Sequence, residues 1–372
     1  MTLRLVAVCG DPGGASAVAP VLELMMRENR VKVDAFAYRQ ACDVWQKRGM
    51  QFEALDEAVP QEEIDSLLRI PETRLLLTGT SVNGVDLEKR FIASARNRQL
   101  PSLALLDYWS NYGARFSVGE GKPAGFPDRI AVMDEWARDE MLAEGFDATR
   151  LAVTGQPAFD SLLGKTLAND VERQRIRDGL NIANDELVVL FASQPLAEVN
   201  GLSRGDSQWL GYDEKSVLSG LLRALDELSE AYLREIVLLV LPHPRENRAI
   251  FAGIGGNSVR VLVAAHGDAL GVAKAADVVT GMNSVLLMES CYSGLLTVSL
   301  QPGLRRADSL PASRLGVCPA VYRDADMLPV LDRMLFDSAA RADCRAKLAE
   351  FVPDGKAARR VADLAYRMAG VE

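Results

Sequence analysis

The sequence of 372 residues contains little histidine and cysteine, and this scarcity argues against several kinds of site. With two histidines, His243 and His266, the chain cannot build a metal site from several histidine ligands. Its five cysteines are odd in number, are scattered and include no C-x-x-C pair, so neither a disulfide framework nor a cysteine-bound zinc is indicated. Reduced thiols are the simplest interpretation.

The chain also lacks an excess of positive charge, a long apolar run and a signal peptide. Its 42 lysines and arginines against 51 acidic residues give a net charge of −9, whereas a general nucleic-acid binder needs a basic face. No apolar run reaches the roughly 18–20 residues of a membrane helix, and the N-terminus enters an apolar strand directly. We therefore expect a cytoplasmic protein that binds no nucleic acid. A local phosphate pocket and peripheral membrane contact remain open.

What the sequence does contain is an alternation of short apolar runs with amphipathic stretches. In the first half, the predicted strands are Leu3–Val8, Val31–Tyr38, Arg74–Leu77, Ser102–Leu106, Arg129–Val132 and Leu151–Val153. The predicted helices between them are Ala17–Arg27, Gln40–Arg48, Glu62–Leu68, Asp86–Arg98 and Glu135–Glu144. This alternation predicts a parallel sheet with helices on both faces.

A second alternation follows a polar, helical stretch at Leu167–Leu180, which we interpret as the linker between two domains. Its predicted strands are Leu187–Ala192, Glu235–Leu241, Val259–Val263, Asp277–Thr280 and Leu296–Leu300. Its predicted helices are Lys215–Leu233, Asp268–Ala275, Ser284–Tyr292, Met327–Phe336, Ala339–Phe351 and Gly355–Met368. The first domain is predicted to span 1–166 with 353–372, and the second 167–352. Ala197–Tyr212 is predicted to be a long loop over the strand ends.

Candidate site residues lie where strands end and helices begin, because parallel α/β folds bind ligands at that edge. The first such point, Gly10–Ala15, has the sequence GDPGGA. Gly13 and Gly14 let the backbone approach a phosphate at a helix N-terminus; a plain tight turn is the alternative. Asp11 is a candidate general base toward a hydroxyl, and capping the helix is its alternative role.

Asp107 follows another strand and is the second candidate base. A carboxylate at a strand end is costly to bury without a partner, which argues for a specific role. Aromatic residues follow it, including Trp109; they suit either a stacked sugar or the closure of the core. Asp134, at the next strand end, is a natural helix N-cap.

In the second half, His243 stands directly after a strand between Pro242 and Pro244. Proline fixes φ, so the imidazole is held rigidly and is able to donate to a phosphate. Arg245 adds a second donor. Ser193 and Gln194 end the first strand of this half and are predicted to line the same site; a turn is the alternative.

Asn283 and Ser284 lie between a strand and a helix and are candidate N-caps. The functional interpretation adds that Ser284 and the neighbouring amides hold a diphosphate at the helix dipole. Glu289 lies further along this otherwise apolar helix, so it requires a specific partner, for example ribose hydroxyls.

Three segments resemble motifs of one superfamily. Val153–Asp160, with the sequence VTGQPAFD, is similar to a VTGNPxxD motif; His243 with Pro244 resembles an HP motif; and Asn283–Glu289 resembles a DxSSxxxE segment. In this order they resemble the GT-B superfamily of nucleotide-sugar glycosyltransferases, UDP-N-acetylglucosamine 2-epimerases and CDP-glycerol-type transferases. The resemblance implies two Rossmann-like domains that face each other across a cleft, with the last helix crossing back to the first domain.

The resemblance implies a metal-independent glycosyltransferase of surface polysaccharide or glycolipid biosynthesis. Its donor would be a UDP- or CMP/CDP-linked sugar, its acceptor a glycan or lipid-linked hydroxyl, and no further cofactor is implied. His243 and Ser284 would stabilise the leaving diphosphate, Glu289 would hold the ribose, and Asp11 or Asp107 would deprotonate the acceptor. Gln301–Arg306 stands where epimerases carry a TERPE-like segment, which argues against epimerisation. An epimerase, a CDP-alditol phosphotransferase and a non-catalytic nucleotide-sugar-binding protein are the alternatives.

Overall fold

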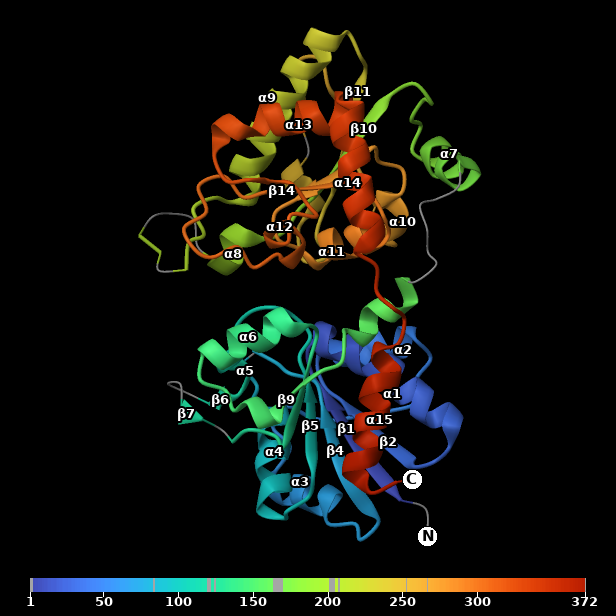
Figure 1. Ribbon diagram of the computed structural model, residues 1–372, viewed down its shortest axis with the longest axis vertical. Helices are drawn as coiled ribbons and strands as arrows, with labels where there is room; N and C mark the ends of the chain where they lie inside the picture. The colour runs from blue at the N-terminus through green and yellow to red at the C-terminus, as the bar shows by residue number, and fades with distance from the viewer. Residues whose placement is uncertain are drawn as a thin grey trace. The chain divides into compact units, whose positions relative to one another are not determined.

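The computed structural model describes residues 3–82, 84–118, 122–123, 125–162, 170–200, 205–206, 208–251, 253–265 and 267–371. The chain divides into two compact units. The first comprises Met1–Ser161 with Pro353–Glu372, and the second Leu162–Val352 (Figure 1). No helix among the described residues is long and apolar enough to cross a membrane.

The first unit is built on a seven-stranded sheet with the order β3-β2-β1-β4-β5-β8-β9, in which all neighbours are parallel. The strands are β1 (Arg4–Cys9), β2 (Lys32–Ala37), β3 (Glu53–Ala54), β4 (Thr73–Thr78), β5 (Ser102–Leu105), β8 (Arg129–Val132) and β9 (Leu151–Val153). The α-helices are α1 (Pro12–Glu28), α2 (Gln40–Lys47), α3 (Gln61–Leu68), α4 (Leu87–Asn97), α5 (Tyr112–Arg115), α6 (Glu135–Ala143) and α15 (Ala357–Ala369). A short pair, β6 (Ser117–Val118) and β7 (Lys122–Pro123), is antiparallel.

Strand β1 shows why the predicted strands are continuously apolar. All six of its residues are buried. Leu5 and Ala7 belong to the core beneath α1 and α15, and Val6 and Val8 belong to the core on the opposite face, beneath α3 and α4. Because both faces of a parallel sheet are covered by helices, both sets of side chains must be apolar.

The last helix, α15, belongs to the first unit although it follows the second unit in sequence. Its Ala362 packs in the same core as α1 (Figure 1). Asp160, the last residue of the VTGQPAFD segment, accepts hydrogen bonds from the amides of Ala357 at 3.0 Å and Ala358 at 2.7 Å. This carboxylate therefore satisfies two of the unpaired amides at the start of α15.

The second unit contains a six-stranded parallel sheet with the order β12-β11-β10-β13-β14-β15. The strands are β10 (Leu187–Ala192), β11 (Ile236–Leu241), β12 (Arg260–Val263), β13 (Val278–Gly281), β14 (Thr297–Leu300) and β15 (Ala320–Val321). The α-helices are α7 (Asp170–Gly179), α8 (Leu196–Asn200), α9 (Glu214–Tyr232), α10 (Ala269–Ala273), α11 (Val285–Tyr292), α12 (Pro311–Arg314), α13 (Met327–Phe336) and α14 (Ser338–Glu350).

The predicted GT-B architecture is confirmed: there are two parallel α/β sheets, and the C-terminal helix packs on α1. Some details were wrong. Helix α1 begins at Pro12, five residues before the predicted start, because proline at a first helical position needs no amide hydrogen bond. The predicted loop Ala197–Tyr212, which lies partly outside the described residues, overlaps helix α8. The predicted linker Leu167–Leu180 begins outside the described residues, and its predicted helical character is confirmed by α7.

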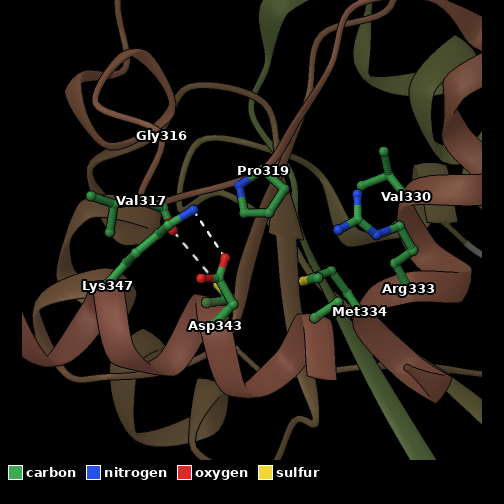
Figure 2. A pocket seen from close by; sticks show the side chains of 10 residues that line it. Gly316, Val317, Pro319, Val330, Arg333, Met334, Asp343 and Lys347 are labelled. Atoms are coloured by element: carbon green, nitrogen blue, oxygen red, sulfur yellow. Dashed lines mark hydrogen bonds and ion pairs between the residues drawn. The ribbon is translucent and has the colours of Figure 1, made fainter. Parts of the chain in front are cut away.

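A surface cavity of about 180 Å³ lies between α13, α14 and the residues Gly316, Val317 and Pro319 before β15 (Figure 2). Its lining mixes aliphatic side chains with an ion pair in which Lys347 Nζ lies 3.0 Å from Asp343 Oδ2. None of the residues predicted to form the site lines this cavity. The predicted site residues therefore lie away from this cavity.

Candidate functional site

Strand order reverses once in each sheet: β1 lies between β2 and β4, and β10 lies between β11 and β13. At such a switch point, ligands bind outside the carboxyl ends of the strands. In the first unit, the loops at this point carry Asp11 and Thr80; in the second, they carry Gln194 and Asn283. Asp11, Gln194 and Asn283, which are predicted from the sequence, therefore lie at the switch points, whereas Asp107 follows β5, outside the switch point of the first sheet.

In the second unit, Ser193 and Gln194 follow β10 and contact the loops on both sides. Ser193 Oγ donates to Glu246 Oε1 at 2.8 Å, in the turn after β11. Gln194 Oε1 accepts a hydrogen bond from the amide of Asn283 at 3.1 Å, and Asn283 Nδ2 donates to Ser309 Oγ at 3.1 Å. These hydrogen bonds hold the loops after β10, β11 and β13 together.

His243 begins a turn that fixes its imidazole. The amide of Glu246 donates to the carbonyl of His243 at 2.8 Å, and the buried carboxylate of Glu246 accepts the amide of His243 at 2.6 Å. Nδ1 of the half-buried imidazole accepts a hydrogen bond from the amide of Arg245 at 3.2 Å. This contact leaves the proton of a neutral ring on Nε2, which is then a donor. The side chain of Arg245 is exposed.

Helix α11 begins immediately after Ser284, whose backbone has the extended conformation of an N-cap. Its hydroxyl does not cap the helix. Ser284 Oγ is buried and has no hydrogen-bond partner within the described part of the chain. The first amides of a helix also lack intrahelical partners and carry the positive end of the dipole. An anion at this point would satisfy both. Glu289 is half-buried further along the same helix.

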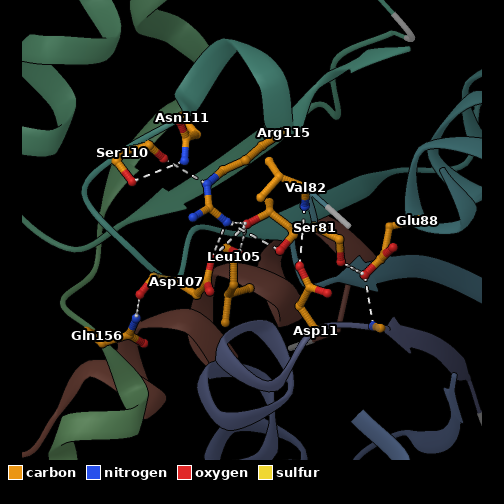
Figure 3. A network of polar contacts seen from close by, with 12 residues as sticks. Asp11, Ser81, Val82, Glu88, Leu105, Asp107, Ser110, Asn111, Arg115 and Gln156 are labelled. Atoms are coloured by element: carbon orange, nitrogen blue, oxygen red, sulfur yellow. Dashed lines mark hydrogen bonds and ion pairs between the residues drawn. The ribbon is translucent and has the colours of Figure 1, made fainter. Parts of the chain in front are cut away.

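In the first unit, Asp11 is the N-cap residue of α1, but its side chain makes no capping hydrogen bond. Instead, Asp11 Oδ2 accepts the amide of Val82 at 3.3 Å, from the loop after β4 (Figure 3). The side chain of Asp11 therefore does not cap helix α1. Asp11 remains partly exposed at the switch point.

Asp107 is held in a buried ion pair. Arg115 Nη1, from α5, contacts Asp107 Oδ1, and the two side chains are 5% and 12% exposed (Figure 3). Thr80 Oγ1 donates to the same oxygen at 3.2 Å. The second oxygen, Oδ2, lies 2.0 Å from where a Cβ on Gly13 would stand, so only glycine fits there. Arg115 is therefore the partner that a buried Asp107 carboxylate requires.

The same contact bears on the predicted phosphate loop. A carboxylate of the chain itself lies against Gly13, and Gly14 is buried in the first turn of α1. The first turn of α1 therefore already faces an acidic side chain. The unsatisfied hydroxyl and amides at the start of α11 are the better place for an anion.

The aromatic residues after β5 close the core. Trp109 is 3% exposed and stacks on Phe159, with ring centroids 6.3 Å apart. Its Nε1 donates to Asp134 Oδ2 at 2.7 Å. Asp134 Oδ1 accepts the amide of Ala137 at 2.7 Å and caps α6, as the sequence predicts. Trp109 is consequently a core residue.

Sequence reasoning missed a third carboxylate in the first unit, Glu88. It is 3% exposed; its Oε1 accepts the amide of Gly10 at 2.9 Å and the hydroxyl of Ser81 at 2.5 Å, and its Oε2 accepts the hydroxyl of Tyr38. Burial raises the pKa of Glu88, and the charge of Asp11 acts in the same direction. No sequence signal marks this residue, because an acidic residue in the first turn of a helix commonly serves the dipole.

The described residues contain no group of three or more histidine, cysteine or acidic side chains placed to hold a metal ion. Arg115 and Glu246 were also missed as site residues. No sequence pattern links Arg115 to Asp107. Glu246 could have been found, because it lies in the same turn as His243.

No protein-family model and no curated protein matches the chain. Solved structures do. A UDP-GlcNAc 2-epimerase from Neisseria meningitidis bound to UDP-GlcNAc is 12% identical, with a TM-score of 0.65 over 98% of this chain and 100% of that one. An epimerase from Methanocaldococcus jannaschii is 13% identical, with a TM-score of 0.66 over 98% and 100%. A glycosyltransferase from Rickettsia africae is 8% identical, with a TM-score of 0.69 over 99% and 98%. At these identities the likeness establishes the GT-B fold.

Proposed function

We propose that this protein is a nucleotide-sugar enzyme, and specifically a glycosyltransferase of surface polysaccharide or glycolipid biosynthesis. It would move a sugar from a UDP- or CMP/CDP-linked donor to a hydroxyl of a glycan or lipid-linked acceptor. The second unit binds the donor in this proposal, and the first unit supplies the base. Asp11, which is partly exposed, is a better base than Asp107, whose carboxylate is paired with Arg115.

The observation that carries the proposal is the pair of donors at the switch point of the second sheet. Ser284 Oγ is buried without a partner in the described residues. The amide of Arg245 donates to Nδ1 of His243, which places the proton of a neutral imidazole on Nε2. His243 follows β11 and Ser284 follows β13, and both strands pair with β10. A diphosphate leaving group would accept these hydrogen bonds together with the amides of α11, and its developing charge would be stabilised there. Glu289 would contact the ribose.

A thermal-shift screen against UDP, CMP, CDP, GDP and their common sugar conjugates tests the donor class. A ligand at about 100 times its Kd stabilises the native state by about 2.7 kcal/mol, which for a domain of this size raises Tm by roughly 5–10 °C. We expect such a rise with one uridine or cytidine nucleotide. No rise with any nucleotide would contradict the proposed donor site.

A UDP-GlcNAc-type 2-epimerase is the second candidate, because solved epimerases share the fold over nearly the whole chain. Product analysis by NMR separates the two activities. Sugar transferred to an added acceptor indicates a transferase, whereas a donor isomerised without acceptor indicates an epimerase. A phosphodiester product would indicate a phosphotransferase.

Replacement of Ser284 by alanine is expected to weaken donor binding about tenfold or more without lowering Tm. A hydrogen bond to a charged group is worth about 1.5–3 kcal/mol, and a buried unsatisfied hydroxyl costs the native state free energy. Isothermal titration and thermal denaturation measure the two effects. Ser290→Ala is the matched control, because its hydroxyl lies on the same helix and is also buried without a partner in the described chain. Equal loss of affinity in both variants would argue against a phosphate contact.

A further inference from the structure

Glu88 is a buried carboxylate that the proposed chemistry does not use. It is 3% exposed and has no ion-pair partner among the described residues. Lys89, its neighbour on α4, pairs instead with Asp86 at 2.8 Å. A buried carboxylate without a cation is costly, so a specific role is expected for it.

The contacts of Glu88 converge on Asp11 (Figure 3). One oxygen, Oε1, accepts the amide of Gly10, the residue before Asp11, at 2.9 Å. The same oxygen accepts the hydroxyl of Ser81 at 2.5 Å. Ser81 directly precedes Val82, whose amide donates to Asp11 Oδ2 at 3.3 Å. Both segments that hold Asp11 are thus tied to a single oxygen atom.

The other oxygen of Glu88 allows two protonation states without movement of the loops. Tyr38 Oη contacts Glu88 Oε2 and also lies 3.3 Å from the carbonyl of Val85. When Glu88 is ionised, the Tyr38 hydroxyl donates to Oε2. When Glu88 is protonated, its O–H donates to Tyr38 Oη, and the Tyr38 hydroxyl donates to the Val85 carbonyl.

We propose that Glu88 is the positioning residue for Asp11, holding both segments around it through one carboxylate oxygen. This inference rests on the proposed role of Asp11 as base. Glu88 acts only through Asp11, since its side chain is buried and contacts protein groups.

Among the ionisable groups around Glu88, Asp11 is the one whose charge raises the pKa of Glu88. Cys9, at the end of β1, is buried, and burial and the charge of Glu88 raise the pKa of its thiol well above the ordinary range. That thiol stays neutral at physiological pH. Tyr38 donates a neutral hydroxyl hydrogen bond. Burial, followed by the charge of Asp11, raises the pKa of Glu88, while the hydrogen bonds from Ser81 and Tyr38 oppose the rise.

The raised pKa of Glu88 determines how this residue affects the stability of the protein at different pH values. The pKa of Glu88 is higher in the native state than its ordinary value of 4.5. Its favourable contribution is therefore fully present below pH 4.5 and is lost as pH rises through the native pKa. Ionisation of this carboxyl is less favourable in the native state than in the unfolded chain, so Glu88→Gln is expected to have a Tm at pH 7 no lower than that of the wild type.

The kinetic experiment compares wild type, Glu88→Gln and Glu88→Ala. Glu88→Gln keeps an oxygen that can accept the amide of Gly10 and the hydroxyl of Ser81, so its kcat is expected to stay close to that of the wild type. In Glu88→Ala, loss of positioning is expected to lower kcat about 100-fold. The KM for the donor is expected to stay unchanged in both variants. Unchanged kcat in Glu88→Ala, or an equal loss of kcat in Glu88→Gln and Glu88→Ala, would overturn the proposal.

Glu186→Gln is the matched control for the kinetic comparison. Glu186 is also buried and accepts a backbone amide, that of Ala183, at 2.6 Å, but it precedes β10 at the amino end of the second sheet. It is paired with Arg260 at 2.7 Å. Its replacement is expected to lower Tm and to leave kcat unchanged, as a general loss of stability would.

A titration of free protein tests the coupling even if no substrate turns over. The side-chain carboxyl carbon of Glu88 is followed by ¹³C NMR in wild type and in Asp11→Asn. The midpoint is expected to fall in the variant, because the charge that raises the pKa of Glu88 has been removed. An unchanged midpoint overturns the inference. Failure of the proposed function would appear separately, as absence of nucleotide binding and turnover by the wild type.

Discussion

Asp11→Asn is expected to lower kcat by about 10³-fold while leaving the fold intact. Asparagine keeps an oxygen that can accept the amide of Val82 and is a favourable residue at a helix N-cap, so the structural consequences are small. It cannot accept a proton from an acceptor hydroxyl. Turnover of the donor identified by the nucleotide screen, measured with Tm for each variant, gives both quantities.

Asp107→Asn separates the two candidate bases. Because Arg115 is 5% exposed, loss of its counter-charge leaves a buried cation unpaired and is expected to lower the free energy of unfolding by about 3–5 kcal/mol. Its loss of activity should therefore accompany a loss of stability, and the double variant Asp107→Asn/Arg115→Gln should recover part of that stability. If Asp107→Asn stays stable and loses kcat while Asp11→Asn stays active, Asp107 is the base.

The fold was largely predictable because both faces of each central strand are buried. The six residues of β1 and the six of β11 are all buried, so each strand appears in the sequence as an unbroken apolar run. In each of the two large sheets, one short strand escaped prediction. β3 (Glu53–Ala54) and β15 (Ala320–Val321) each contain two residues at the edge of a sheet, too few for a hydrophobic pattern to develop.

The candidate site was predictable only in part, since position along the chain reveals strand ends but not the partners brought to them. Asp11 and Ser284 were found because each lies within three residues of the end of a strand. Glu88 contacts Gly10 across 78 residues of sequence, a pairing that no local pattern encodes. Arg115 lies on α5, a helix of four residues. Asp11 and Ser284 were found by their position near strand ends, whereas Glu88 and Arg115 are brought to strand ends from other segments of the chain.

His243→Ala is expected to reduce the donor-dependent rise in Tm and to lower kcat/KM by about 10²–10³-fold. The imidazole is a rigid donor, because its Nδ1 is engaged with the amide of Arg245 and the turn is closed by Glu246. Since the proposed contact is to charge that develops on the leaving diphosphate, the loss should be larger in kcat than in donor affinity. Titration calorimetry and steady-state kinetics measure the two separately.

Two further variants test whether the donor proton of His243, rather than its bulk, produces this effect. His243→Gln retains an N–H donor on a side chain of similar length and is expected to recover part of kcat, whereas His243→Ala cannot. Arg245→Ala removes an exposed cation from the same turn, and its effect is expected to be smaller and to weaken with added salt, since exposed charges are screened. If His243→Gln is as inactive as His243→Ala while Arg245→Ala loses donor binding completely, the phosphate is held by the arginine. The turn after β11 would then bind the donor through charge, and the imidazole would serve only to shape it.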